Sequence, residues 1–251
     1  MASLKLISCL FFLSPIAIFA QTVISEPIFH ICSIAGTFQP DSPYAQNLKV
    51  LLEYLNLKTP PTGFFTSSVG IKPDKVYGLS ICRGDVSSAT CKLCVTDASQ
   101  QIRKRCPFNK EAIIWYDYCL VKYSDECFKG EIDNKNQFNW WNGTVTNPET
   151  FNLMTKELMG CLAERASSVP DFFATREIDI EKGQKLYGLV QCTRDLSKED
   201  CKKCLDGNIA ELSNCCAGKR GARVVGGSCI VRYETYPFFK APQKLEYIID
   251  A

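Results

Sequence analysis

The hydrophobic positions of this chain follow a helical period in two stretches, one in each half. Apolar residues three and four positions apart form a stripe along one side of a helix. Pro148 and Glu149 precede the second stripe, where a proline and an acidic residue suit a first helical turn. The stripes therefore predict one helix in each half, through Tyr44, Leu48, Leu51, Leu52 and Leu55 in the first and Phe151, Thr155, Leu158, Met159 and Leu162 in the second.

The pattern that follows each helix is also the same in both halves. An aromatic pair, which we place in the core, is followed by a β-prone run, a second helix and two alternating runs. Ser87 and Ser197 can cap the second helices. We expect an α+β fold of two tandem repeats, each with two helices packed on one antiparallel β-sheet. The expected positions are 64–65, 76–79, 88–103, 112–116 and 119–123, then 172–173, 186–190, 197–212, 223–225 and 229–233.

The repeated pattern reflects an internal duplication. A shift of 110 positions aligns residues 75–124 with residues 185–234 without a gap. We therefore predict two domains, 21–131 and 138–245, with the boundary in the polar stretch 131–137. The residues that recur identically 110 positions later are Lys75, Tyr77, Gly78, Leu79, Cys82, Asp85, Ser87, Cys91, Lys92, Cys94, Cys106, Cys119, Val121 and Tyr123.

The first twenty residues are typical of a secretory signal peptide. Lys5 precedes a short apolar run that ends in a small residue, Ala20. A short membrane anchor is the alternative, but the run is shorter than the roughly 20 residues that a spanning helix needs. We therefore assign residues 1–20 to a signal peptide and expect a secreted, extracellular protein without membrane insertion.

Composition narrows the choice of partners. The chain of 251 residues is 46% hydrophobic, which is typical of a globular protein. Its 29 basic and 27 acidic residues nearly cancel, so the chain lacks the basic excess of a nucleic-acid-binding protein. We expect no nucleic acid as a partner.

The cysteines point to disulfides. Of the 15 cysteines, Cys9 belongs to the signal peptide, which leaves an even number for an oxidising compartment. The spacing C-x8-C-x2-C occurs twice, and its C-x2-C part could also bind zinc or form a thioredoxin-like redox pair. Secretion, the cysteine eight positions upstream and the lack of a βαβ pattern favour disulfides over both alternatives. Asn142 begins a glycosylation sequon, Asn-Gly-Thr, which agrees with secretion.

The spacing also carries a resemblance. The two motifs, each with Tyr-Gly-Leu before it and Cys-x-x-Lys/Arg-Tyr after it, resemble the plant ginkbilobin-2 homologous or stress-antifungal domain. Two such domains behind a signal peptide, without a kinase domain, are similar to the cysteine-rich repeat secretory proteins. The resemblance covers nearly the whole mature chain.

The resemblance implies a disulfide pairing. In the family the first cysteine joins the one after the second helix, the x8 loop closes on itself, and the x2 cysteine joins the last strand. The implied bridges are Cys32–Cys106, Cys82–Cys91, Cys94–Cys119, Cys192–Cys201 and Cys204–Cys229. The counterpart of Cys32 falls near Asn139 or Trp140, so that Cys216 lacks its family partner. Cys127, Cys161, Cys215 and Cys216 have no template, and we expect Cys161 to bridge to Cys215 or Cys216 because the two helices of a domain should pack together.

Catalytic chemistry has little support in the sequence. The single histidine, His30, has no counterpart in the second copy and is expected at the surface or in an edge strand. The acidic pairs Asp125-Glu126 and Glu199-Asp200 suit a solvated surface better than glycoside hydrolysis. Gly226-Gly227 suits a turn between strands rather than a phosphate-binding loop. We expect a protein that is not an enzyme and that has no cofactor and no metal site.

Binding is the better class of function. The founding member of the family that the chain resembles is similar to a small lectin, in which an asparagine after the first cysteine, an arginine and a glutamate hold mannose. The second copy matches with Arg223 and Glu234, and Asn139 is the assigned asparagine, with Asn142 as a nearby candidate. The alternative is that Arg223 and Glu234 form only a cross-strand pair within the sheet. The first copy has lost the site, since its matching residues are Ser33, Ile113 and Ser124.

We therefore expect a secreted plant protein of the apoplast that acts in defence or stress by binding, with mannose-containing glycans as ligands and an antifungal role. The alternative is a protein–protein interaction module, a soluble partner of the extracellular receptor ectodomains of cysteine-rich receptor-like kinases. A lectin would elute from its target with free mannose, whereas a protein partner would not.

Overall fold

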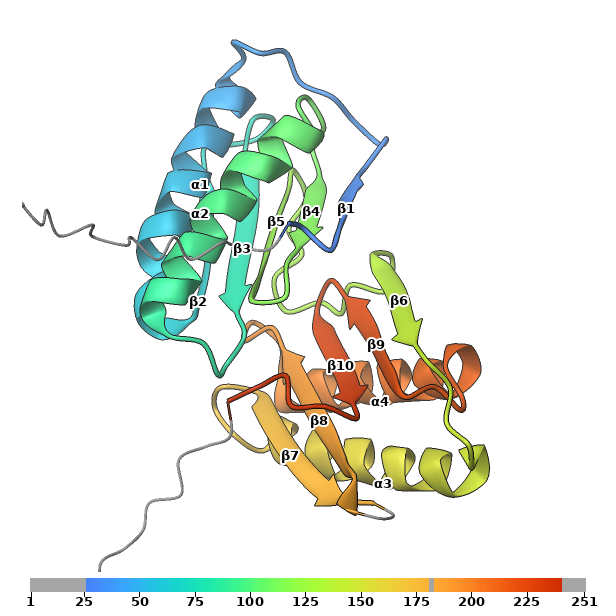
Figure 1. Cartoon of the computed structure of the whole chain (residues 1–251). Helices are drawn as coiled ribbons and strands as arrows, with labels where there is room; N and C mark the ends of the chain where they lie inside the picture. Colours follow the sequence, from blue (N-terminus) through green and yellow to red (C-terminus); the bar gives the residue numbers. More distant parts are fainter. Residues whose placement is uncertain (1–25, 181–182, 241–251) are drawn as a thin grey trace, which may run out of the picture.

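The computed structural model describes residues 26–180 and 183–240. The predicted signal peptide and the outer ends of the two predicted domains lie outside these residues. Figure 1 shows two units, one from each half of the chain, in which two helices cover one face of a sheet. This is the predicted α+β fold. Unit one contains β1 (Phe29–Cys32), α1 (Pro43–Thr62), β2 (Phe64–Val69), β3 (Val76–Cys82), α2 (Ser88–Arg105), β4 (Ala112–Trp115) and β5 (Cys119–Ser124). Unit two contains β6 (Gln137–Asn142), α3 (Pro148–Ser167), β7 (Phe173–Asp179), β8 (Lys185–Cys192), α4 (Lys198–Cys215), β9 (Gly221–Gly226) and β10 (Cys229–Glu234).

Both sheets have five antiparallel strands in the same order. The orders are β1-β4-β5-β3-β2 and β6-β9-β10-β8-β7. The strand register keeps the sequence shift of 110, because Cys82 pairs with Cys119 and Cys192 pairs with Cys229. The edge strands β6, β2 and β7 are additions to the predicted pattern, whereas β1 is the edge strand expected as one of the two possible places for His30.

The helices begin where the sequence predicts. The side chains of Ser87 and Ser197 accept hydrogen bonds from the backbone N–H groups of Thr90 and Asp200, which caps α2 and α4. Helix α1 ends at Gly63, whose φ of 77° is a left-handed conformation that favours glycine. No helix among the described residues is both long enough and apolar enough to cross a membrane.

Each pair of helices packs its apolar stripe on the sheet. Leu51 of α1 and Leu162 of α3 are buried there. A Cβ atom added at Gly78 would lie 2.7 Å from Leu51 Cδ2, and one at Gly188 would lie 2.7 Å from Leu162 Cδ1. The glycine in the repeated Tyr-Gly-Leu therefore allows the first helix to approach the sheet closely.

The disulfides of the structure include the five pairs that the resemblance implies. In each unit, one bridge closes the x8 loop and another joins the second helix to the last strand. Unit one has an additional bridge between β1 and the end of α2, which unit two lacks. The five bridges are Cys32–Cys106, Cys82–Cys91, Cys94–Cys119, Cys192–Cys201 and Cys204–Cys229.

The prediction that Cys161 forms a disulfide with Cys215 or Cys216 is wrong. Cys215 pairs with its neighbour Cys216, and Cys161 and Cys127 are exposed free thiols. Cys161 lies on the outer side of α3, where Arg176 Nη1 of β7 lies 3.3 Å from its Sγ. The side chain therefore points toward the sheet edge and away from the end of α4.

The two units pack through the sheet faces that lie opposite their helices. An apolar cluster between them is formed by Leu79, Ile81, Ile113, Trp115, Leu120 and Val225. Phe64 packs against this cluster, whereas Phe65 packs under the helices. The first aromatic pair is therefore divided between the interface and the core of unit one, instead of lying wholly in the core.

Polar contacts at the interface are arranged with an approximate two-fold symmetry. The tip of the β9–β10 hairpin reaches unit one, where Lys122 Nζ donates to the carbonyl oxygen of Gly227 at 3.0 Å. The tip of the β4–β5 hairpin reaches unit two, where Arg232 Nη1 donates to Asp117 Oδ1 at 3.3 Å. Both residue pairs are related by the shift of 110. The two copies therefore meet as two subunits of a symmetric dimer would.

Candidate functional site

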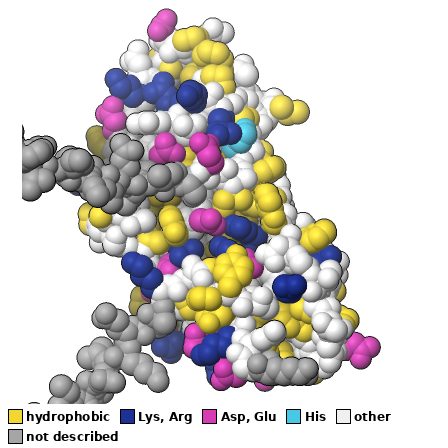
Figure 2. All heavy atoms as spheres, in the orientation of Figure 1, with side chains coloured by type: hydrophobic (Ala, Val, Ile, Leu, Met, Phe, Trp, Pro, Cys, Tyr) yellow, Lys and Arg dark blue, Asp and Glu magenta, His cyan; other side chains and the backbone are white. Residues whose placement is uncertain are grey.

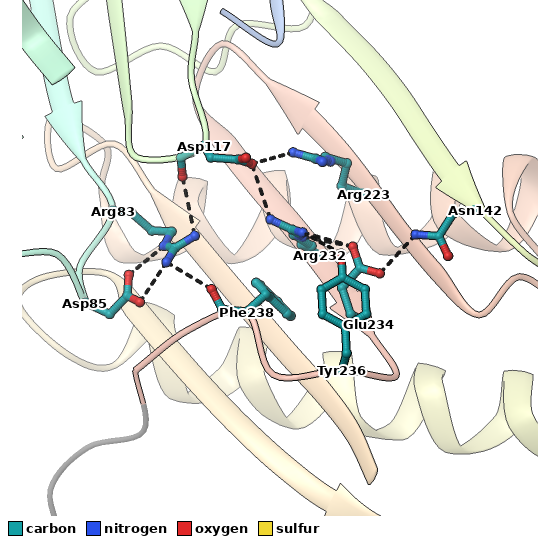
Figure 3. Close-up of polar contacts among 9 residues, drawn as sticks. All are labelled: Arg83, Asp85, Asp117, Asn142, Arg223, Arg232, Glu234, Tyr236 and Phe238. Atoms are coloured by element: carbon teal, nitrogen blue, oxygen red, sulfur yellow. Dashed lines mark hydrogen bonds and ion pairs between the residues drawn. The ribbon is translucent and has the colours of Figure 1, made fainter. Parts of the chain in front are cut away.

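Arg223 and Glu234, two of the three residues of the predicted sugar site, lie on the face of unit two that is turned toward unit one. Side chains two positions apart on a strand share a face, which places Arg232 and Glu234 of β10 together. Arg223 of β9 pairs in register with Arg232. Asn142, the last residue of β6, pairs with Gly221. Figure 3 shows these four polar side chains on neighbouring strands.

Glu234 is the centre of the cluster and is only 3% exposed. Its Oε1 accepts hydrogen bonds from Arg232 Nε at 3.1 Å and lies 3.0 Å from Arg232 Nη2. Its Oε2 accepts from Asn142 Nδ2 at 3.1 Å. A Cβ at position 221 would lie 1.8 Å from Oε2, so Gly221 leaves the space that the carboxylate needs. A buried carboxylate is stable because it is paired and hydrogen-bonded in this way.

Asp117 joins this cluster from unit one. Its Oδ1 accepts from Arg223 Nη1 at 2.8 Å, in addition to the contact with Arg232. Arg83 Nη2, which is held by Asp85 Oδ2 at 2.8 Å, approaches from the same side. Figure 2 shows side chains of both charges, together with hydrophobic ones, where the two units meet. The cluster is therefore an ionic connection between the units as well as a polar face.

The segment that follows β10 covers part of the cluster. The guanidinium of Arg232 lies over the ring of Phe238 at 4.2 Å, and Arg232 Nη2 donates to Tyr236 Oη at 3.3 Å. Arg83 Nη2 donates to the carbonyl oxygen of Phe238 at 3.1 Å. The segment crosses from unit two to unit one and fixes both arginines (Figure 3).

The structure brings Arg223 and Glu234 to one face but places Asn139 elsewhere. Asn139 pairs with Val224, and successive side chains of a strand point to opposite faces, so that Asn139 is turned away from Asn142. Asn142 is the asparagine beside Glu234, and the assignment of Asn139 is corrected to it. The error comes from a shift in register, because Trp141 rather than Trp140 occupies the position of Cys32.

Register identifies this position directly. Trp141 pairs with Ala222, as Cys32 pairs with Ala112 in unit one. The residue after it, Asn142, therefore occupies the place of Ser33. The sequence alone could have identified Arg232, because it lies two positions from Glu234 on the same strand face. Asp117 comes from the other unit, and no nearby residue in the sequence indicates its role.

Two tryptophans of the edge strand β6 and a groove lie beside the cluster, with Trp140 on the sheet face of the cluster and Trp141 on the opposite face. Trp140 and Trp141 are 58% and 48% exposed, and Lys219 Nζ lies 3.8 Å from the centre of the Trp141 ring. Trp140 pairs with Arg223 and therefore shares its sheet face. A groove of about 750 Å³ next to the cluster is lined by polar residues that include Thr144, Asn147, Thr150, Arg220 and Thr235.

The corresponding face of unit one has different chemistry. Lys122 takes the place of Arg232 and is almost fully buried, with Asp133 Oδ2 at 3.8 Å and the ring of Phe128 at 4.4 Å. Burial lowers the pKa of Lys122, an effect that nearby carboxylates, with Asp133 first, partly offset. Ser124 stands where unit two has Glu234, so unit one has no carboxylate at this position.

Other candidate chemistry is distributed elsewhere. His30 lies in the edge strand β1, as expected, where partial burial and the neighbouring Arg105 lower its pKa. Cys91 and Cys94, which have the spacing of zinc ligands, form disulfides with different partners and are therefore not free to bind zinc. Within 26–180 and 183–240, no group of three or more His, Cys, Asp or Glu residues is arranged to hold a metal.

Comparisons with known proteins identify the relatives of the chain. The model of a family described as salt stress response/antifungal matches residues 31–126 and 138–236. An antimicrobial ginkbilobin-2-like protein of Castanea crenata is 50% identical over 242 residues, which cover 96% of this chain and all of that protein. Cysteine-rich repeat secretory protein 38 of Arabidopsis thaliana is 51% identical over 229 residues, which cover 88% of this chain and 90% of that protein.

A solved structure agrees with the fold. The tandem DUF26 ectodomain of the cysteine-rich receptor-like protein PDLP8 of Arabidopsis thaliana has a TM-score of 0.72 and 23% identity, and the match covers 84% of this chain and 98% of that one. The kinship with proteins named as secretory confirms the expected extracellular location. Since the family model matches both units, the chain belongs to the salt stress response/antifungal family of tandem cysteine-rich repeat proteins.

Proposed function

We propose that the protein acts by binding rather than by catalysis, and that it recognises a mannose-type carbohydrate through the polar face of unit two. The observation that carries this proposal is the contact between Asn142 Nδ2 and Glu234 Oε2 at 3.1 Å, with two arginines on the adjoining strands. Sugars present rows of hydroxyl groups that both donate and accept. A carboxylate accepts from them, a guanidinium donates to them, and an amide does both.

The surroundings of the pair also suit a sugar. Trp140 lies on the same sheet face and is largely exposed, so that its apolar ring is available to the C–H face of a sugar. Asn142 is exposed, whereas Glu234 is buried and held by Arg232. A ligand that reaches Glu234, the last residue of the central strand β10, therefore meets a carboxylate that is already fixed and does not have to order a mobile one.

Asp117 sets the condition for binding. Its Oδ1 lies 2.8 Å from Arg223 Nη1, so that a sugar oxygen must compete with this carboxylate for the guanidinium. The side chain of Asp117 is 35% exposed, which makes the exchange possible at the surface. Loss of Asp117 should release Arg223 and strengthen sugar binding.

The test uses unglycosylated protein from a bacterial periplasm, which permits disulfides, and titration with a mannose oligosaccharide. Arg223→Ala removes a charged hydrogen bond and should weaken binding by about tenfold or more. Asp117→Ala should strengthen it. Ser124→Ala, at the position of unit one that matches Glu234, is the control and should bind as wild type. A folded wild type that binds no mannose oligosaccharide would refute the proposal.

The relationship to receptor ectodomains supports a second proposed function, that of a protein–protein interaction module. Its partner would be a receptor ectodomain of the same fold, and the exposed Trp140 and Trp141 would be part of the contact. Capture of such an ectodomain that persists in free mannose would favour this function. Elution by free mannose would favour the lectin, with an antimicrobial role like that named for the relative from Castanea crenata.

A further inference from the structure

The asparagine beside Glu234 is also the asparagine of the glycosylation sequon. Asn142-Gly143-Thr144 is the one N-x-S/T sequence in the 251 residues. We propose that Asn142 is N-glycosylated during secretion and that its glycan covers the polar face of unit two. Only protein that lacks this glycan would then bind an external glycan. This last step rests on the proposed sugar binding.

The position of Asn142 suits modification. It is the last residue of β6, and its side chain is exposed. The chain then turns at Gly143, whose φ is 52°, and leaves the sheet. The backbone at this point is fixed, because the carbonyl oxygen of Asn142 accepts from the N–H of Arg220 at 3.2 Å. A glycan can therefore project into solvent without displacing the core.

The chemical step uses a lipid-linked oligosaccharide as co-reactant. The side-chain amide nitrogen forms a bond to C1 of the terminal N-acetylglucosamine. The bond between C1 and the pyrophosphate oxygen breaks, and the polyprenyl pyrophosphate leaves with the electron pair. The amide loses one of its two hydrogens as a proton. One N–H remains, which is sufficient for the hydrogen bond that Asn142 donates to Glu234 Oε2.

Modification and recognition compete for the same space. The first sugar ring is attached directly to Nδ2, which lies 3.1 Å from Glu234 Oε2. An external sugar that approaches this oxygen must enter the volume that the attached ring occupies. The face of unit one has Ser33 at the corresponding position and has no such sequon. The conflict is thus specific to the unit that carries the candidate site.

The test is secretion of the protein from a glycosylating eukaryotic host, followed by peptide mass mapping and titration with a mannose oligosaccharide. Thr144→Ala removes the sequon but keeps Asn142 and the Thr144 carbonyl oxygen that accepts from Arg220 Nε at 3.1 Å. Thr144→Ser keeps the sequon and is the matched control. We expect a glycan on Asn142 in wild type and in Thr144→Ser, none in Thr144→Ala, and at least about tenfold tighter binding by Thr144→Ala.

The outcomes separate this inference from the proposed function. Unmodified Asn142 in wild type, from a host that modifies a control sequon, overturns the glycosylation. If glycosylated wild type and Thr144→Ala bind the oligosaccharide equally well, the inference that the glycan covers the site is overturned. If neither Thr144→Ala nor unglycosylated periplasmic wild type binds the oligosaccharide, the sugar-binding function fails and the covering fails with it, while the mapped modification stands. Periplasmic wild type needs no substitution, so misfolding of a variant cannot produce this result.

Discussion

The two units place different residues in the same positions of one symmetric interface. Lys122 lies over the ring of Phe128 in unit one, and Arg232 lies over the ring of Phe238 in unit two. Gly130 N–H donates to Asp195 Oδ2 in the opposite unit, and Lys240 N–H donates to Asp85 Oδ2. Each residue of one pair lies 110 positions from its counterpart in the other. The segment after β5 therefore contacts unit two in the same way as the segment after β10 contacts unit one.

The two units differ in the charged groups that surround these matching residues. Lys122 donates to a backbone carbonyl oxygen and has one carboxylate, that of Asp133, at 3.8 Å, whereas Arg232 contacts two carboxylates at 3.3 and 3.0 Å. Asp85 is paired with Arg83, but the residue that matches Arg83 in unit two is Thr193, and one oxygen of Asp195 has no hydrogen-bond partner among the described residues. Duplication thus preserved the geometry of the interface, while changes of single side chains placed the arginine and glutamate residues of the proposed sugar site in unit two alone.

The comparison first predicts that the disulfides that differ between the units contribute unequally to the free energy of unfolding. Cys32–Cys106 closes a separation of 74 residues, so that replacing both cysteines by serine should lower the free energy of unfolding by about 4 kcal/mol. Cys215 and Cys216 are adjacent, and their bridge restricts the unfolded chain little, so that serine at both positions should have a much smaller effect. Urea unfolding of the two variants measures the difference, and similar losses would contradict the entropic argument.

The second prediction compares the two buried cations. Arg232→Met leaves the carboxylate of Glu234 buried without its ionic partner and should cost about 3 kcal/mol. Lys122→Met should cost less, about 1 kcal/mol for the lost hydrogen bond to Gly227, because burial already disfavours the charge of Lys122 and its carboxylate neighbour Asp133 lies 3.8 Å away. Asp133 also keeps its hydrogen bonds from Asn136. Equal costs in urea unfolding would show that the two positions are energetically equivalent despite their different partners.

The third prediction restores to unit two the bridge that only unit one has. Trp141 pairs with Ala222 as Cys32 pairs with Ala112, and Cys216 follows α4 as Cys106 follows α2.

Trp141→Cys together with Cys215→Ser should therefore form a bridge between positions 141 and 216. We expect a gain of about 2 kcal/mol, less than the full entropic value because the ring beside Lys219 is lost. Non-reducing peptide mapping checks the bridge. A free thiol at position 141 would mean that the strand register does not place the two sulfur atoms within reach.

The sequence predicted what depends on local pattern. Helix stripes, the caps at Ser87 and Ser197 and the alternating strands are local, and the 110-residue shift carried them from one copy to the other. The pairing of Cys82 with Cys91 came from family resemblance, since spacing alone does not select one pairing among many.

The rest depends on contacts between distant segments. The choice between Asn139 and Asn142 required the register of β6 against β9, which a one-residue shift reverses. Asp117 enters the cluster from the other unit. In these cases no residue near in sequence carries the information.

The smallest expected effect is the pH dependence of stability that follows from the burial of Lys122. Desolvation lowers the pKa of Lys122 in the folded protein, so that below its ordinary value of 10.5 the unfolded chain binds more protons than the folded one. The free energy of unfolding should therefore rise with pH as the pH approaches 10.5 from below. Lys122→Arg does not titrate in this range and should lack the rise.

The measurement is the difference in urea stability between wild type and Lys122→Arg from pH 7 to pH 10.5. Burial raises the pKa of Tyr123 and Tyr233, which removes stability above pH 10, but both proteins share this loss and it cancels in the difference. Cys127 and Cys161 are replaced by serine in both proteins, because their thiolates would exchange with the disulfides at high pH. A difference that stays constant over this range would mean that Lys122 is as well solvated in the fold as in the unfolded chain, and the contrast between the two buried cations would then be one of partners alone.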